Sequence, residues 1–186
     1  MSLIIVGTSL TTAVKGSNLR NSLGFRWETT PCIVTWNCDF DTDEREAVRA
    51  AMSAWNAVAD TDGSGRVASY LSNYVDSENQ INYAIFRSGT IGHTNVNDID
   101  GYIVDVTIAL TTMVDWSVGA SAGAYDIQSV VQHELGHALG VAHCHESGSS
   151  GSLGSCPNNV MSPRFGKNQI RRTLTTYDIT SYQSIY

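Results

Sequence analysis

The sequence predicts a single α+β domain in which a mixed β-sheet is backed by two helices. Along the chain, the predicted elements run strand, helix, several strands, then helices. Apolar residues between positions 48 and 59 recur at helical spacing. The length, 186 residues, suits one domain, and the sequence shows no internal repeat and no sign of a second domain. We therefore treat residues 1–186 as one folding unit.

The first third of the chain is expected to hold an arm, a strand and a helix. Residues 1–25 lack a clear period and are rich in Ser, Thr, Asn and Gly, which favours a peripheral arm. Residues 31–36 combine β-branched and aromatic side chains, as a buried strand does. Asp41 or Thr42 should then cap a helix, because acidic residues follow in its first turn. The turn residues at 60–65 should end it.

Extended segments fill the middle of the chain, and helices return near its end. Strands are predicted at residues 67–71, 80–86, 90–96 and 102–112. In the second of these, Ile81, Tyr83 and Ile85 alternate with Asn82, Ala84 and Phe86, so both faces are expected to be covered. A second long helix is predicted over residues 126–139. A short last helix should begin at about Thr175, which forms a capping pattern with Asp178.

The composition is that of a globular protein and argues against two kinds of partner. Apolar residues make up 42% of the chain and charged residues 16%. The net charge of −7 lacks the basic footprint of a nucleic-acid-binding protein. No stretch approaches the roughly 20 apolar residues of a membrane-spanning helix. We expect a monomer that neither binds nucleic acid nor inserts into a membrane.

Four cysteines permit two disulfides and point to an oxidising compartment. Cys144 and Cys156 flank a Gly/Ser-rich segment whose ends a bridge could join, and we expect them to pair. If Cys32 and Cys38 lay on one continuous strand, their Cα atoms would be about 20 Å apart, whereas a disulfide needs about 4.4–6.8 Å. Either the chain turns between these two, or they pair elsewhere, or they stay reduced. We expect a secreted domain from which any export signal has been removed.

The most informative segment is residues 133–143, HELGHALGVAH. Residues four apart on a helix lie on nearly the same face, so His133 and His137 can present two imidazoles to one metal ion. Glu134 projects beside that point, where it can contact a metal-bound water without ligating the metal. Gly140 can adopt the left-handed conformation that ends a helix, which would turn His143 back toward the metal. Three protein ligands leave a fourth position open, as in catalytic zinc sites.

Plainer interpretations of these residues explain less. Ordinary histidines on an amphipathic helix would account for none of the spacing. Cys144 or His145 could serve as the third ligand, but neither completes the spacing as His143 does. The sequence therefore predicts one catalytic zinc ion, with Glu134 as general base.

This segment, followed by NVMSP at residues 159–163, resembles the zinc signature and Met-turn of the metzincin proteases. Within that clan, the chain is most similar to the matrixins, the matrix-metalloproteinase group. Residues 26–28 are similar to the matrixin opening, and residues 105–116 resemble its last sheet strand. Asp178 is similar to the aspartate that supports the Met-turn. The resemblance covers about residues 26–186.

The resemblance implies a zincin-like fold with a twisted, mixed five-stranded sheet backed by two long helices. It places residues 26–140 in an upper subdomain and residues 141–186 in a small lower one that contains the Met-turn and ends in a helix. Met161 would form the apolar floor of the zinc site. The resemblance also implies that residues 90–96 form the sheet edge along the cleft. Two short segments are the substrate-binding candidates: Ile91, Gly92, His93 and Thr94 on that edge, and Pro163, Arg164 and Phe165 after the Met-turn.

Some features depart from the family or are open to other interpretations. Pro163 occupies the position where some metzincins carry a tyrosine that assists the transition state. His93 is the only histidine outside residues 133–145, so a second, structural zinc is not expected. Residues 60–65 and 95–101 have the oxygen-rich composition of calcium loops, but neither completes an EF-hand, and solvated turns explain them more simply.

The predicted function is zinc-dependent hydrolysis of peptide bonds in protein substrates. Two other functions are compatible with the same residues. The zinc could be structural, although a structural site normally has four protein ligands. Alternatively, the chain could be a zinc hydrolase that acts on a small amide or ester.

Overall fold

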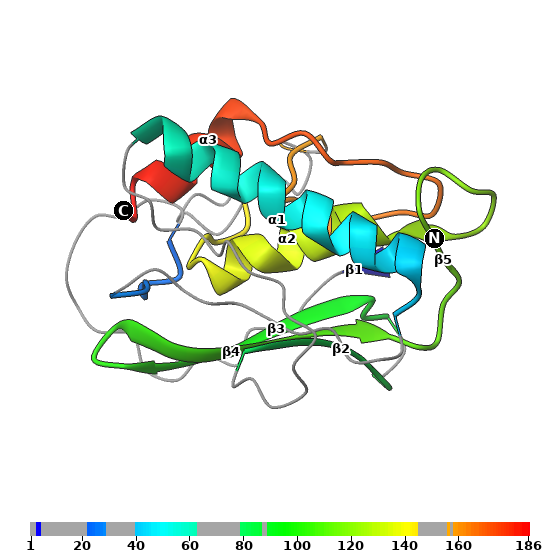
Figure 1. Ribbon diagram of the computed structural model, residues 1–186, viewed down its shortest axis with the longest axis horizontal. Helices are drawn as coiled ribbons and strands as arrows, with labels where there is room; N and C mark the ends of the chain where they lie inside the picture. Colours follow the sequence, from blue (N-terminus) through cyan, green and yellow to red (C-terminus); the bar gives the residue numbers. More distant parts are fainter. Residues whose placement is uncertain are drawn as a thin grey trace.

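The computed structural model describes residues 3–4, 22–28, 40–62, 79–86, 89–144, 156 and 158–186. In this part of the chain, three helices accompany a mixed sheet and two short strand pairs. Helix α2 (Ile127–Ala138) packs on the sheet and also on α1 (Thr42–Asp62), and α3 (Thr176–Gln183) lies near one end of α1 (Figure 1). The predicted α+β class is therefore confirmed.

The three helices begin close to where the sequence predicts. Before α1, Glu44 N–H donates to Asp41 Oδ1 (2.9 Å) and Asp41 N–H donates to Glu44 Oε2 (2.9 Å), which satisfies two amides that helix geometry leaves free. At α3 the predicted cap is confirmed, because Thr175 and Asp178 form a reciprocal capping box. The second helix is capped by Asp126, the first residue of its predicted range.

The main sheet has the strand order β2–β4–β3. Strand β2 (Gln80–Ala84) runs parallel to the central strand β4 (Tyr102–Thr111), and β3 (Gly92–Ile99) runs antiparallel to it. In the described part of the sheet, β3 is therefore an edge strand. A two-residue turn joins β3 to β4, and both of its residues have positive φ: Asp100 at 53° and Gly101 at 82°. The end of the suggested calcium segment 95–101 is thus the turn of a β-hairpin.

Two short strand pairs complete the described strands. Strand β5 (Trp116–Ser117) runs parallel to β6 (Tyr125–Asp126), directly before α2. Strand β1 (Leu3–Ile4) pairs antiparallel with β7 (Arg164–Phe165), which follows the predicted Met-turn.

Two of the predicted strands fall in parts of the chain that the structure does not describe. The strands expected at residues 31–36 and 67–71 lie outside the described residues, as do Cys32 and Cys38, so the five-stranded sheet stays a prediction. The expectation that both faces of residues 80–86 are covered is wrong at one position. Strand β2 ends at Ala84, and the Ile85 side chain beyond it is 80% exposed because it has left the sheet.

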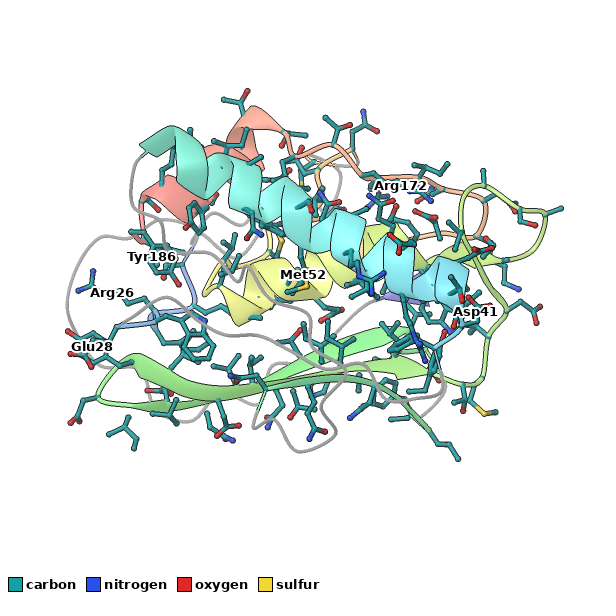
Figure 2. The ribbon with its side chains drawn as sticks, in the orientation of Figure 1. Arg26, Glu28, Asp41, Met52, Arg172 and Tyr186 are labelled. Carbon is teal, nitrogen blue, oxygen red and sulfur yellow. A yellow bond between two sulfur atoms is a disulfide. The ribbon has the colours of Figure 1, made fainter. Side chains whose placement is uncertain are left out.

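The core lies around α2, where the sheet and α1 meet. Met52 belongs to the buried face of α1 (Figure 2). The largest fully buried side chains come from all three helices, the sheet and the connections: Phe40, Trp55, Ile81, Ile91, Ile108, Leu110, Ile127, Leu135, Leu139 and Tyr182. Among the described residues, no helix has the length and apolar character needed to cross a membrane.

Candidate metal centre

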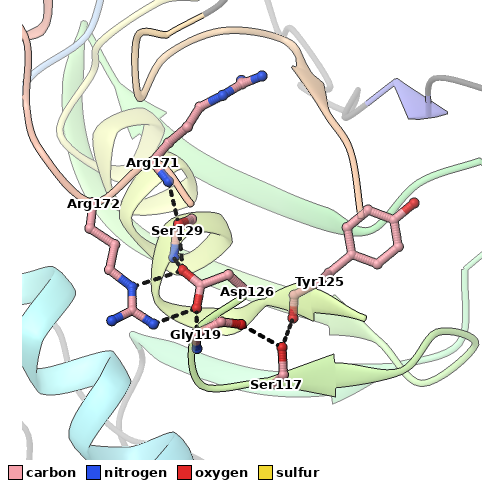
Figure 3. A network of polar contacts seen from close by, with 7 residues as sticks. All are labelled: Ser117, Gly119, Tyr125, Asp126, Ser129, Arg171 and Arg172. Atoms are coloured by element: carbon pink, nitrogen blue, oxygen red, sulfur yellow. Dashed lines mark hydrogen bonds and ion pairs between the residues drawn. The ribbon is translucent and has the colours of Figure 1, made fainter. Parts of the chain in front are cut away.

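The N-terminal end of α2 is fixed by a buried aspartate (Figure 3). The Asp126 carboxylate accepts hydrogen bonds from Gly119 N–H (2.8 Å), Ser129 N–H (3.1 Å) and the Ser129 hydroxyl. Arg172 donates two more hydrogen bonds to this carboxylate, one from Nε–H (2.9 Å) and one from a second guanidinium nitrogen. Burial alone would raise the pKa of Asp126, but the bonds from Arg172, Ser129 and Gly119 outweigh it, and the pKa lies below its usual value. The helix therefore begins on a carboxylate that stays ionised.

The C-terminal end of α2 turns sharply at Gly140, as predicted. Gly140 has φ +84°, its N–H donates to His137 O (2.9 Å), and Val141 N–H donates to Gly136 O (2.9 Å). This pair of bonds is the Schellman arrangement, in which a left-handed residue ends the helix. A Cβ at Gly140 would collide with Phe25 O, so glycine is required here by both its backbone conformation and its surroundings.

An N-terminal segment and the C-terminus close this end of the helix. Leu23 N–H donates to Gly140 O (2.8 Å), and Trp27 Nε1–H donates to Ala138 O (2.8 Å). The Tyr186 hydroxyl donates to Leu139 O (3.1 Å). The predicted arm, residues 1–25, lies largely outside the described residues, but Ser22, Leu23 and Phe25 near its end contact the turn that precedes His143.

The three predicted histidine ligands converge. His137 Nε2 and His143 Nε2 are 3.0 Å apart, and His143 Nε2 and His133 Nε2 are 3.2 Å apart. The other ring nitrogens of the two helical histidines face main-chain carbonyls: His133 Nδ1 lies 2.7 Å from Val160 O, and His137 Nδ1 lies 2.8 Å from Val141 O. A carbonyl can only accept, so Nδ1 carries the hydrogen and Nε2 presents its lone pair to the common point.

This donor set fits zinc. Ligand nitrogens at about 2.0–2.1 Å from a tetrahedral zinc would be about 3.3 Å from one another, close to the separations seen here. Burial, together with the nearby His137 and His143, holds the pKa of His133 well below its usual value, so the ring is neutral and able to ligate. Among the described residues, these three histidines are the one group of His, Cys, Asp and Glu that could hold a metal ion.

Glu134 lies on the same helix with its carboxylate against β3. The residue is 1% exposed, and Oε2 accepts a hydrogen bond of 2.6 Å from the Thr94 hydroxyl. Burial raises the pKa of Glu134 to about 8, while the hydrogen bond from Thr94 acts in the opposite direction. The three histidines form the ligand group without this carboxylate.

Met161 lies beneath the helix and is fully buried. Gly136, between the two helical ligands, faces the Met161 thioether so closely that a Cβ there would collide with the sulfur. The turn is fixed from α3, because Asp178 accepts hydrogen bonds from Val160 N–H (3.2 Å) and Met161 N–H (3.1 Å). The support that the resemblance assigned to Asp178 is thus present.

A disulfide ties the third ligand to the Met-turn. Cys144 and Cys156 are bonded, with Cα atoms 6.5 Å apart, as the sequence predicts. Cys144 N–H also donates to Met161 O (3.1 Å). His143 is therefore fixed on both sides: by the Gly140 turn before it and by the bridge after it.

The predicted substrate-binding residues fall into two groups. Ile91 is buried and precedes β3, while Gly92, His93 and Thr94 lie on β3 itself; the half-buried ring of His93 contacts Phe86 edge-on. Pro163 and Arg164 are half-buried after the Met-turn, and Phe165 is buried beneath the Arg171 guanidinium. The substrate-binding role of both groups remains a prediction.

The side chains that hold the two ends of α2 were not predicted from the sequence. Asp126 and Ser129 had a local signal, the spacing of an N-cap and its third helical residue. Arg172 and Trp27 had none, because each reaches α2 from a distant part of the chain.

The comparison with known families agrees with this geometry. The family model described as Matrixin matches residues 27–186, which is most of the chain. A search of curated proteins finds no match. The matched region contains the three histidines, Glu134 and the turn at Met161. The chain therefore belongs to the matrixin family of zinc metalloendopeptidases.

Proposed function

We propose that this metalloprotease cleaves internal peptide bonds of protein substrates with Glu134 as its general base. The main support for this proposal is the position of the Glu134 carboxylate. The Glu134 carboxylate is buried next to the His133 ligand but outside the ligand group. A carboxylate so placed is free to exchange protons, and its burial favours proton uptake because burial raises the pKa of Glu134.

The chemistry assigned to the residues follows from this placement. Zinc, when held by the three imidazoles, supplies Lewis-acid chemistry that acidifies a water and polarises the scissile carbonyl. Glu134 accepts a proton from the water as its oxygen bonds to the carbonyl carbon. Glu134 then donates this proton to the peptide nitrogen as the C–N bond breaks. The products are a carboxylic acid and an amine, and the carboxylate is regenerated.

Strand β3 is the proposed platform for the substrate. An edge strand offers main-chain groups to an extended peptide, and such pairing tolerates many substrate sequences. Ile91, Gly92 and His93 would pair with the substrate backbone. Pro163, Arg164 and Phe165 would form the wall of the side-chain pocket next to the leaving group.

The proposal extends to the setting in which the enzyme works. The Cys144–Cys156 bridge favours an oxidising compartment, and we place the enzyme outside the cell, acting as a monomer.

Digestion of casein with and without a chelator tests the activity, and Glu134→Ala tests the base. We expect this variant to keep one zinc per chain and to lose activity by roughly a hundredfold to ten-thousandfold. Glu46→Ala removes an exposed carboxylate from α1 and should behave as the parent protein. Loss of zinc from Glu134→Ala, or retention of most activity, would contradict the assignment.

His143→Ala separates the ligand role from the catalytic role. Because His143 follows the helix, its removal should weaken zinc binding in a chelator competition more than it lowers the melting temperature. Near-parental zinc affinity would mean that another side chain, such as His145, supplies the third ligand.

A further inference from the structure

The edge strand β3 forms a cradle around the Glu134 carboxylate. Gly92 and Thr94 are two residues apart, so they lie on the same face of the strand. Thr94 is 1% exposed, and its hydroxyl lies 2.6 Å from Glu134 Oε2 and 3.0 Å from Glu134 O. A hydroxyl has one hydrogen to give, and the carboxylate oxygen Oε2 is the nearer of its two acceptors.

Gly92 makes room for the other carboxylate oxygen. A Cβ at Gly92 would stand 2.6 Å from Glu134 Oε1 and 2.9 Å from Val130 Cγ1, so only glycine leaves the carboxylate undisturbed in this position. Oε1 is buried and has no hydrogen-bond partner among the described residues. The two oxygens therefore differ: the Thr94 hydroxyl holds Oε2, whereas no described residue donates to Oε1.

We infer that Thr94 is a positioning residue, which fixes the Glu134 carboxylate so that Oε1 can receive the proton of the attacking water. This inference rests on the proposed role of Glu134 as the general base. The last torsion of a glutamate side chain is broad and poorly fixed by itself. A β-branched threonine is stiff at χ1, so its hydroxyl defines the orientation of the carboxylate. The role differs from the substrate contact that the sequence suggested for this residue.

A set of substitutions at Thr94 tests the inference. Thr94→Val keeps the shape of the side chain and removes the hydroxyl, whereas Thr94→Ser keeps the hydroxyl. On a fluorogenic peptide, we expect Thr94→Val to lower kcat roughly tenfold to a hundredfold with KM changed by less than about threefold. Zinc should remain at one ion per chain. Thr94→Ser should restore most of the parental kcat, which a purely structural role in packing would not predict.

Thr111→Val is the matched control. Thr111 is also 1% exposed, lies on the neighbouring strand β4, and uses its hydroxyl to accept a hydrogen bond from Met113 N–H (3.2 Å). Thr111→Val therefore makes the same chemical change at an equally buried position. This substitution should leave kcat near the parental value. Should Thr94→Val fail to fold, Thr94→Ala removes the hydroxyl without steric demand and is expected to show the same loss of kcat.

The outcomes separate this inference from the proposed function. Thr94→Val or Thr94→Ala with kcat within about threefold of the parent overturns the role of Thr94. So does loss of zinc from these variants, or an equal loss of kcat in Thr111→Val. An active Glu134→Ala would instead overturn the general-base assignment on which the inference depends.

Discussion

The two ends of α2 are held by different kinds of interaction, although they flank one candidate metal centre. At the N-terminal end, the Asp126 carboxylate gathers donors from Gly119, Ser129 and Arg172. At the C-terminal end, the turn at Gly140 is built from main-chain hydrogen bonds and closed by the Trp27 and Tyr186 side chains. The first end depends on charge and the second on backbone shape, so different perturbations should damage them.

The chemistry of a helix explains part of this division. The N-terminal end of a helix favours negative charge because its free N–H groups and dipole are positive there, and a buried aspartate satisfies both. The C-terminal end must leave the helical path within one residue for His143 to reach the ligand site. Backbone conformation achieves that reversal, and a charged side chain could not replace it.

Gly140→Ala should cause the largest loss of stability. An alanine at φ +84° is strained, and its Cβ would also collide with Phe25 O, so we expect a loss of roughly 2–4 kcal/mol in the free energy of unfolding. Zinc affinity should fall as well, since His143 follows this turn. Denaturant unfolding and a chelator competition measure the two effects.

Gly123→Ala is the matched control for that change. Gly123 has nearly the same φ, +83°, but a Cβ there would meet nothing within 4 Å. This variant should lose only the stability that backbone strain costs, about 1–2 kcal/mol in the free energy of unfolding. Its zinc affinity should stay at the parental value. Equal losses in the two variants would show that the contact with Phe25 contributes nothing.

Arg172→Met should have the next largest effect. It removes the guanidinium but keeps much of the side-chain volume, and it leaves Asp126 with its bonds from Gly119 and Ser129. Because the Asp126 side chain is fully buried, we expect a loss of about 1–2 kcal/mol. Zinc affinity should change little, since the ligands lie farther along the helix. A zinc affinity as low as that of Gly140→Ala would remove the distinction between the two ends.

The smallest effect should appear in the pH dependence of stability. Asp126 has a folded-state pKa below its usual value of 3.8, so its contribution is fully present above that value and is lost as the pH falls through the folded pKa. Stability of the zinc-free protein should therefore decline more steeply below about pH 4 in the parent than in Arg172→Met. Parallel curves for the two proteins would show that this ion pair does not govern the acid response.

The convergence of the three histidines could be predicted from the sequence because their geometry is local. A helix fixes the relation of His133 to His137, and one glycine signals the reversal toward His143. The bridge between Cys144 and Cys156 was likewise predicted from spacing. The contact between Thr94 and Glu134 could not be, since it depends on where β3 crosses α2, 40 residues away in the chain.

Contacts between distant parts of the chain also explain the other predictions that were wrong or missing. The alternation in residues 80–86 is a strand signal, but it does not say where pairing with β4 stops, and Ile85 therefore proved exposed. The bond from Trp27 to Ala138 O joins residues 111 apart. Such contacts follow from the packing of whole elements, which local periodicity does not contain.

The Cys144–Cys156 bridge has a consequence for the covalent continuity of the enzyme. One cysteine adjoins His143, and the other lies shortly before Met161, so the bridge spans the segment between ligand and Met-turn. A single cut in the peptide chain between the two cysteines would leave both fragments joined through sulfur. Such a nicked molecule would migrate as one band without reducing agent and as two bands with it. After such a cut, His143 would still be tethered to the Met-turn through the bridge.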